Sequence, residues 1–181
     1  AALLAETDRA AQDPAIAAIV IAANGPAFCA GHDLKELSAR RADPDAGAAY
    51  FRALMTRCAE VMQALVNCPK PIIAAVEGVA TAAGCQLVAT CDLAVASETA
   101  QFATPGVNIG LFCSTPMVAL TRNVSRKRAM EMLLLGEMLT AREAADYGLV
   151  NRVVPAGGAL TAAIAMAEKI AAKSPLTIAL G

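Results

Sequence analysis

The sequence has a single histidine, and its six cysteines include no Cys-x2-Cys pair. Because zinc sites are usually built from such cysteine pairs or from several histidines, we expect no metal site. The cysteines lie inside apolar segments, and no secretory signal is recognisable at the start. We therefore predict that they are reduced and mostly buried.

Excess charge of one sign and long apolar runs are also missing. The formal net charge is −1, and the lysines and arginines are scattered, which argues against a nucleic-acid surface. No run reaches the roughly 18 consecutive apolar residues that a membrane helix needs. We expect a water-soluble protein that binds small molecules or other protein chains, with neither nucleic acid nor membrane among its partners.

No linker or low-complexity segment divides the 181 residues, of which 57% are hydrophobic and 17% charged. This composition can bury one large core, so we predict a single domain over residues 1–181. The abundance of alanine and other apolar residues predicts a surface that other subunits cover.

Strand-like and helix-like segments alternate along the chain. Apolar, β-branched runs predict buried strands at 16–22, 72–76, 93–96 and 149–154. Apolar spacing and capping residues predict helices at 1–12, 45–67, 83–90, 125–135, 140–148 and 160–173. Asp33 is expected to cap a further short helix. This is an α/β layout, in which ligands bind at strand-to-helix turns.

The stretch GVATAAGCQLVAT, residues 78–90, has only small side chains from Thr81 to Cys85. Such a turn either permits tight packing of a helix on a sheet or brings a ligand atom against bare peptide N–H groups. The residues of this stretch alone leave both interpretations open.

Three segments carry a family resemblance: AFCAGHDLKEL, KPIIAAVEGVATAAGCQLVATCDLAVASETAQFATPGVNIGLF and LTAREAADYGLVNRVVP. In order and spacing they resemble the signatures of the enoyl-CoA hydratase/isomerase (crotonase) superfamily. The resemblance implies a spiral of strand-strand-helix repeats, with two roughly perpendicular sheets surrounded by helices, and a homotrimer or hexamer. It also implies that the chain lacks the family's first strand and C-terminal helices.

The resemblance implies that a coenzyme A thioester is the substrate or ligand and that no cofactor is bound permanently. The backbone N–H groups of His32 and Ala83 would hold the thioester carbonyl oxygen. Gln86 and Gly106 stand where hydratases carry two acid–base glutamates. Since each such group contributes about 10²–10⁴ in rate, losing both would forfeit roughly 10⁴–10⁸.

For coenzyme A itself, the resemblance places Ala30 and Leu34 beside the adenine and Lys35 near a phosphate, with help from Arg40 or Arg41. The alternative is that KELSARR, residues 35–41, is a solvated helix face.

Several polar residues admit two interpretations. The imidazole of His32 could itself act in acid–base chemistry, and Gln86 could be a satisfied polar side chain of the core. We interpret Glu77 as solvated and Asp92 as structural. Further polar residues expected near the acyl end are Asn108, Cys113, Ser114 and Thr115.

We therefore expect an enoyl-CoA hydratase-like protein of fatty-acid metabolism, by family label a lyase, that stabilises a thioester enolate with weak or no hydratase activity. The alternative is a non-catalytic acyl-CoA binder or modulator. Hydroxyisobutyryl-CoA hydrolase chemistry would need carboxylates at Gly106 and Ser114. A Clp-type protease would need a nucleophilic serine, and none lies at 71–96. We expect a bacterial cytoplasmic location or, alternatively, the mitochondrial matrix.

Overall fold

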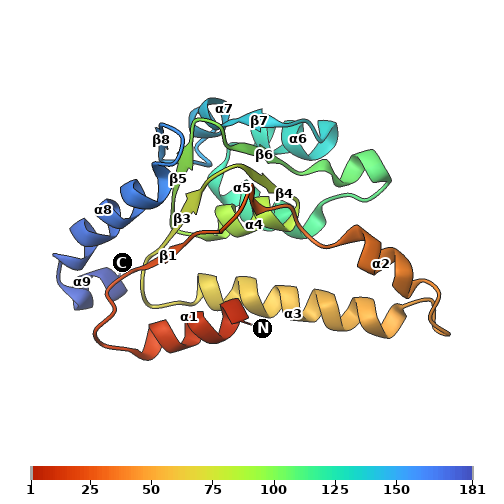
Figure 1. Ribbon diagram of the computed structural model, residues 1–181, viewed down its shortest axis with the longest axis horizontal. Coiled ribbons are helices and arrows are strands. Elements are labelled where there is room, and N and C mark those ends of the chain that lie inside the picture. Colours follow the sequence, from red (N-terminus) through yellow and green to blue (C-terminus); the bar gives the residue numbers. More distant parts are fainter. Residues whose placement is uncertain (1, 181) are drawn as a thin grey trace.

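The computed structural model describes residues 2–180, and its strands form two four-stranded sheets (Figure 1). The first sheet has the order β1 (Ile19–Ile21), β3 (Ile72–Val76), β5 (Leu93–Ser97), β8 (Arg152–Val154). The second has the order β2 (Ala27–Cys29), β4 (Val79–Thr81), β6 (Gln101–Ala103), β7 (Leu139–Thr140). All neighbouring pairs are parallel except β6 and β7.

Helices follow the strand pairs and surround the sheets. They are α1 (Ala2–Gln12), α2 (Leu34–Arg40), α3 (Ala48–Val66), α4 (Ala83–Thr90), the 3-10 helix η1 (Pro105–Ile109), α5 (Ser114–Asn123), α6 (Arg126–Leu135), α7 (Ala141–Asp146), α8 (Ala159–Ala171) and α9 (Pro175–Leu180). The first six strands alternate between the two sheets, and each pair is followed by helix. This arrangement confirms the predicted strand-strand-helix spiral.

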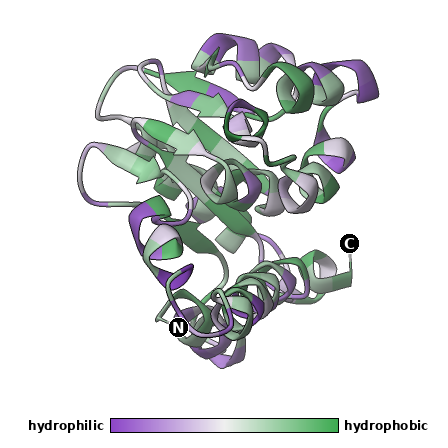
Figure 2. Ribbon diagram, turned by 90° about the vertical axis from the view of Figure 1, so that its right-hand side faces the viewer, coloured by the Kyte–Doolittle hydropathy of each residue, from purple (hydrophilic) through white to green (hydrophobic). Residues whose placement is uncertain are grey.

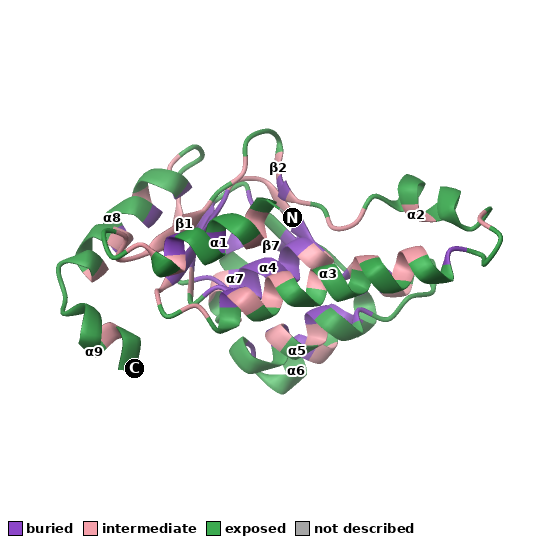
Figure 3. Ribbon diagram, turned by 90° about the horizontal axis from the view of Figure 1, so that it is seen from below, coloured by how far each residue is buried: buried purple, intermediate pink, exposed green. Residues whose placement is uncertain are grey.

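The core lies on the central strands and on α4, which is the most buried helix (Figure 3). The side chains of β3 and most of β5 are buried, and hydropathy is highest through the middle of the molecule (Figure 2). The predicted strand at 16–22 is shorter and only half-buried, because β1 is an edge strand that pairs with β3 alone. None of the helices within residues 2–180 is long and apolar enough to cross a membrane.

Four short strands, β2, β4, β6 and β7, were not predicted. Each is two or three residues long, too short to show an alternating pattern. Two of the three predicted helix caps form the expected hydrogen bonds. The Asp33 carboxylate accepts the N–H groups of Lys35 and Glu36, and Thr140 and Glu143 form the predicted capping box. Ser125 stands at the N-cap of α6 but makes no side-chain cap hydrogen bond.

The two carboxylates near the site have structural roles. The interpretation of Glu77 as solvated was wrong: its oxygens accept the N–H groups of Ala159 (2.8 Å) and Gly157 (3.2 Å) at the start of α8. The structural role of Asp92 is confirmed, because its Oδ2 accepts the N–H of Ile72 at 2.8 Å. Glu77 therefore ties the first sheet to α8, and Asp92 ties the start of β5 to β3 within that sheet.

No cysteine forms a disulfide, and three of the six are buried, whereas the other three are half-buried. Within residues 2–180, no group of three His, Cys, Asp or Glu side chains is placed to hold a metal ion.

Candidate functional site

Two turns that are far apart in the sequence meet at the start of α4. Thr81 Oγ1 donates to the carbonyl oxygen of Ala30 at 3.1 Å. Gly31 has a φ of +99°, and a Cβ there would lie 3.0 Å from Ala82 Cβ and 3.5 Å from the amide nitrogen of Ala83. The first loop therefore lies directly against the first residues of α4, as the resemblance implied.

Packing explains part of the small-residue stretch. A Cβ on Gly84 would lie only 1.9 Å from the carbonyl oxygen of Cys29, so α4 can approach β2 this closely only with glycine at this position. Ala82 has a φ of +52°, a conformation that L-residues rarely adopt. Its N–H donates to Ala103 at 3.0 Å, and its carbonyl oxygen accepts the N–H of Gln86 at 3.0 Å. The backbone around this turn is therefore tightly fixed.

Two N–H groups of this junction remain free. Within the described residues, neither the N–H of His32 nor that of Ala83 has a hydrogen-bond acceptor, and both residues are half-exposed. Ala83 is the first residue of α4, where amides have no partner inside the helix and the helix dipole is positive. We call this pair of N–H groups the carbonyl ledge. It could receive an oxygen that carries negative charge.

Gln86 lies one helical turn beyond Ala83 and is 9% exposed. Its side-chain Oε1 is buried and has no hydrogen-bond partner within residues 2–180, so the interpretation as a satisfied core side chain was wrong. Gln86 lines a cavity of about 330 Å³ between α3, α4 and α5. A buried amide oxygen without a donor is unfavourable by about 1–3 kcal/mol.

Gly106 lies in η1 and is buried. A Cβ there would lie 2.2 Å from the carbonyl oxygen of Leu111 and 2.7 Å from Cys113 Sγ. The φ of Gly106 is not positive, so its requirement for glycine is steric. A glutamate at this position would need the segment 111–113 to move, and we call Gln86 and Gly106 together the acid–base end.

The other polar residues expected near the acyl end lie in different surroundings, and only some of them line the cavity beside Gln86. Thr115 lines the same cavity as Gln86. Asn108 is turned away, because its Nδ2 donates to the carbonyl oxygen of Gly136 at 3.2 Å. Cys113 is buried beside Gly106 and near Cys85. Burial, and secondarily Cys113, raises the pKa of the Cys85 thiol to about 12, so this thiol stays neutral at physiological pH.

The residues expected to contact coenzyme A are all exposed. Ala30 precedes the Gly31 turn, whereas Leu34, which is 55% exposed, and Lys35 begin α2. Helix α2 projects beyond the sheets (Figure 1). No carboxylate within the described range pairs with Lys35. A phosphate contact at Lys35 stays a prediction.

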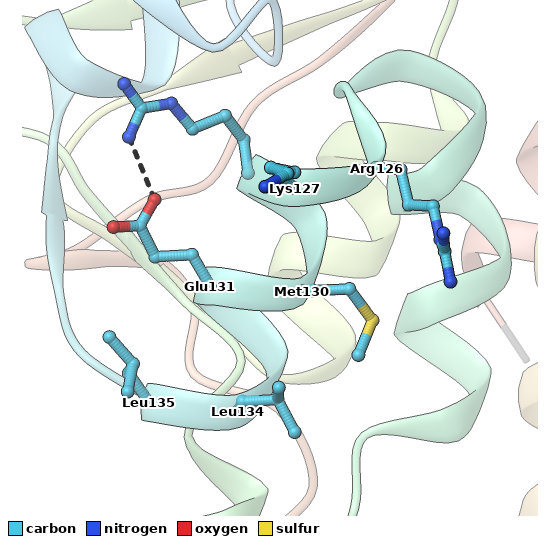
Figure 4. Close-up of a pocket in the computed structure, with 7 residues that line it drawn as sticks. Arg126, Lys127, Met130, Glu131, Leu134 and Leu135 are labelled. Carbon is cyan, nitrogen blue, oxygen red and sulfur yellow. Dashed lines mark hydrogen bonds and ion pairs between the residues drawn. The ribbon is translucent and has the colours of Figure 1, made fainter.

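A wider surface hollow of about 620 Å³ is lined by one face of α6 (Figure 4). Its charges are partly paired, with Arg128 Nη1 donating to Glu131 Oε2 at 2.9 Å. All of its lining residues belong to this one helix, from Arg126 to Leu135, whereas the cavity beside Gln86 is lined by three helices, of which α4 begins at the ledge residue Ala83. We therefore place the functional site at α4.

The structure adds residues to the site that the sequence did not indicate. Met62 and Val66 of α3 and Arg122 of α5 line the cavity beside Gln86. Met62 and Val66 lie in the helix predicted over 45–67, and Arg122 carried no local signal. These residues meet Gln86 only because α3 and α5 both pack on α4.

Comparison with known proteins agrees with this fold. Residues 3–180 match the enoyl-CoA hydratase/isomerase family. The crystal structure of an enoyl-CoA hydratase from Mycobacterium smegmatis is 52% identical, with a TM-score of 0.90 over 99% of this chain and 68% of that one. The structure of human enoyl-CoA hydratase domain-containing protein 3 is 47% identical, with a TM-score of 0.90 over 99% of this chain and 69% of that one.

Sequence comparison gives the same result. The mitochondrial enoyl-CoA hydratase domain-containing protein 3 of Rattus norvegicus is 53% identical over 163 residues, which cover 90% of this chain and 53% of that protein. The chain thus spans about half the length of this relative. It is a crotonase-fold protein. It belongs to the enoyl-CoA hydratase/isomerase family.

Proposed function

We propose that the chain binds acyl-CoA thioesters and holds the thioester carbonyl oxygen on the carbonyl ledge. The observation that supports this most directly is the contact of the Gly31 turn with the start of α4, which leaves the N–H groups of His32 and Ala83 without acceptors. Two such donors at a helix N-terminus stabilise the negative charge of an enolate oxygen.

We propose further that hydratase activity is weak or absent. Hydration needs one group to deprotonate water and another to protonate the α-carbon, and the acid–base end offers an amide and a glycine. The steric closure of Gly106 by Leu111 and Cys113 favours the second candidate, a non-catalytic acyl-CoA binder or modulator of fatty-acid metabolism. Under this proposal the protein binds no cofactor permanently, and the coenzyme A thioester is its ligand.

Calorimetric titration with acetoacetyl-CoA tests binding, with free coenzyme A as the reference. Ala83→Pro removes one ledge donor at the first helical position, where proline is tolerated, and Ala83→Ser keeps it. We expect Ala83→Pro to weaken binding about fivefold, since a neutral hydrogen bond contributes about 1 kcal/mol. Circular dichroism checks that the variant folds. No binding of acetoacetyl-CoA by wild type at millimolar concentration would disprove the proposal.

We also propose self-association as a homotrimer or hexamer. Large apolar side chains on the loop after η1 and on α6 are exposed, among them Leu111 (62%) and Leu134 (56%). Apolar patches of this kind commonly mark subunit contacts. A monodisperse monomer in light scattering would contradict this proposal. A cytoplasmic location, or alternatively the mitochondrial matrix that the rat relative's name gives for that protein, stays a prediction.

A further inference from the structure

The cavity beside Gln86 has an unequal distribution of charge. Its walls are apolar along Met62, Val66 and Val118, and Thr115 adds a hydroxyl group. Within residues 2–180, no Asp or Glu lines it, and Arg122 is its only charged lining residue. An apolar cavity with a single cation suits a chain that is apolar along its length and anionic at one end.

Arg122 is free to bind such an anion. Among the described residues, no carboxylate lies within 4.0 Å of its guanidinium, whereas Arg9, Arg40, Arg57 and Arg128 each have an acidic partner. Asp92 shares with Arg122 an adjoining cavity of about 290 Å³. Its Oδ2 instead accepts the N–H of Ile72. A guanidinium matches the two oxygens of a carboxylate better than an ammonium does, because its donors are planar and paired.

Gln86 gives an independent sign that the cavity takes a polar occupant. It is more than nine-tenths buried, lines the cavity, and leaves Oε1 without a donor within residues 2–180. Its backbone carbonyl oxygen already accepts the hydroxyl of Thr90 at 2.7 Å. The amide of Gln86 thus holds an unsatisfied acceptor beside the cavity, which a donor in the cavity could satisfy once the side chain turned towards it.

The geometry of α4 sets the length of the occupant. Ala83, Gln86 and Thr90 follow one another at helical spacing on one face, and Thr90 lines the cavity together with Arg122. Seven residues of α-helix rise about 10 Å. An extended chain gains about 3.5 Å for every three bonds, so about eight bonds span this length. Fewer bonds are needed where the long side chain of Arg122 reaches inward. An acyl chain of about six carbons fits.

Resting on the proposed function, we propose that the site selects acyl-CoA thioesters whose acyl chain ends in a carboxylate, and that Arg122 binds this carboxylate. The thioester lies at the carbonyl ledge, the chain lies against Met62 and Val118, and the distal carboxylate pairs with Arg122 at the cavity mouth. Arg122 is thus a specificity-determining residue that takes no part in reaction at the thioester.

Adipoyl-CoA and hexanoyl-CoA form a matched pair of probes, since both carry six-carbon acyl groups and differ only in the terminal carboxylate. We expect the full chain to bind adipoyl-CoA about tenfold more tightly in calorimetric titration, which equals about 1.4 kcal/mol. Arg122→Gln should bring adipoyl-CoA to the affinity of hexanoyl-CoA. Arg126→Gln, at an exposed arginine outside this cavity, should retain the tenfold preference.

The outcomes separate this inference from the proposed function. Equal affinity of wild type for the two thioesters, or a preference that survives Arg122→Gln, overturns the role of Arg122 while leaving acyl-CoA binding intact. Failure of both thioesters to bind overturns the proposed function itself. A preference lost with Arg122→Gln and kept with Arg126→Gln supports the inference.

Discussion

Ala83 of the carbonyl ledge and Gln86 of the acid–base end lie a helical turn apart on α4, yet the two parts differ in what carries their chemistry. The ledge is made of backbone N–H groups, which any residue except proline supplies, so His32 and Ala83 can stand there without altering it. Acid–base chemistry depends on side chains, and Gln86 and Gly106 supply only an amide and a glycine. Under the proposed function, the site keeps its means of binding a carbonyl oxygen without a means of moving protons.

The two ends also differ in access. The residues of the ledge are half-exposed, whereas Gly106 is buried against Leu111 and Cys113. Glycine is required sterically at Gly84 and at Gly106 alike, but with different consequences. At Gly84 the close approach brings α4 onto β2 and supports the ledge. At Gly106 it fills the space that any larger side chain would need.

The largest expected effect concerns catalysis. We expect hydration of crotonyl-CoA to be at least about 10⁴-fold slower than by a competent hydratase assayed in parallel, because two acid–base groups are missing. The loss of enoyl thioester absorbance measures this rate. Rapid hydration that survives Gln86→Ala would show that the acid–base groups lie elsewhere, and Cys113 and Ser114 would be the next residues to substitute.

Restoring carboxylates should have different effects at the two positions. Gln86→Glu should fold and raise hydration, since Gln86 faces a cavity. Gly106→Glu should instead destabilise the chain, because even its Cβ would meet the Leu111 carbonyl oxygen. A folded, active double variant would show that the segment 111–113 moves easily.

The second prediction probes access through thiol chemistry. Burial raises the pKa of Cys85 from 9.0 to about 12. At pH 8.5 its thiolate fraction is then about 10³-fold lower than that of an ordinary cysteine, and alkylation by iodoacetamide should slow in proportion. Mass spectrometry after digestion compares Cys85 with the half-buried Cys29 beneath the ledge. Equal labelling of the two would mean that the acid–base end is open.

The same shift predicts the direction of alkaline unfolding. Between pH 9 and 12 the unfolded chain loses the Cys85 proton that the folded chain retains, so stability is full below about pH 9 and falls as the pH rises towards 12. Cys85→Ala should reduce this dependence in urea unfolding measured across that range. Burial also raises the pKa of Cys91 to about 12. Part of the pH dependence of stability should therefore remain in this variant.

The third prediction tests the support of the ledge. Gly84→Ala places a Cβ 1.9 Å from the Cys29 carbonyl oxygen, so we expect the free energy of unfolding to fall by about 3 kcal/mol. Gly110→Ala is the control, because its Cβ would meet nothing within 4 Å. That change should cost only about 1 kcal/mol, for the left-handed conformation at a φ of +76°. Equal losses in urea unfolding would contradict the close contact of α4 with β2.

The sequence indicated the close turn at the start of α4 better than it indicated the surroundings of Gly106 and Arg122, for a physical reason. Small residues from Thr81 to Cys85 and the Ala-Gly turn before His32 are local signals, and local geometry decides where backbone N–H groups point. The closure of Gly106 by Leu111 and Cys113, and the meeting of Arg122 with Gln86, depend on how separate helices pack. Nothing in the local sequence encodes these contacts.

The fold followed the same rule. Long apolar strands such as β3 and capped helices such as α7 were predicted, because their patterns are local. The role of Glu77 was misjudged because its partners, Gly157 and Ala159, lie about eighty residues further along the chain. The three-residue strands β2, β4 and β6 exist only through their neighbours in the sheet.

The smallest predicted effect would raise stability. Gln86 buries an amide oxygen without a donor within residues 2–180, and such a group is unfavourable by about 1–3 kcal/mol. Gln86→Leu should therefore increase the free energy of unfolding by about 1 kcal/mol in urea, the remainder being lost to imperfect packing of the branched side chain. Gln63→Leu, at an exposed glutamine of the same cavity, should change stability by less than about 0.5 kcal/mol.

If Gln86→Leu also weakens binding of acetoacetyl-CoA, the unpartnered oxygen is retained for the ligand. A stabilised variant with unchanged affinity would separate Gln86 from binding and leave the carbonyl ledge as the whole of the site.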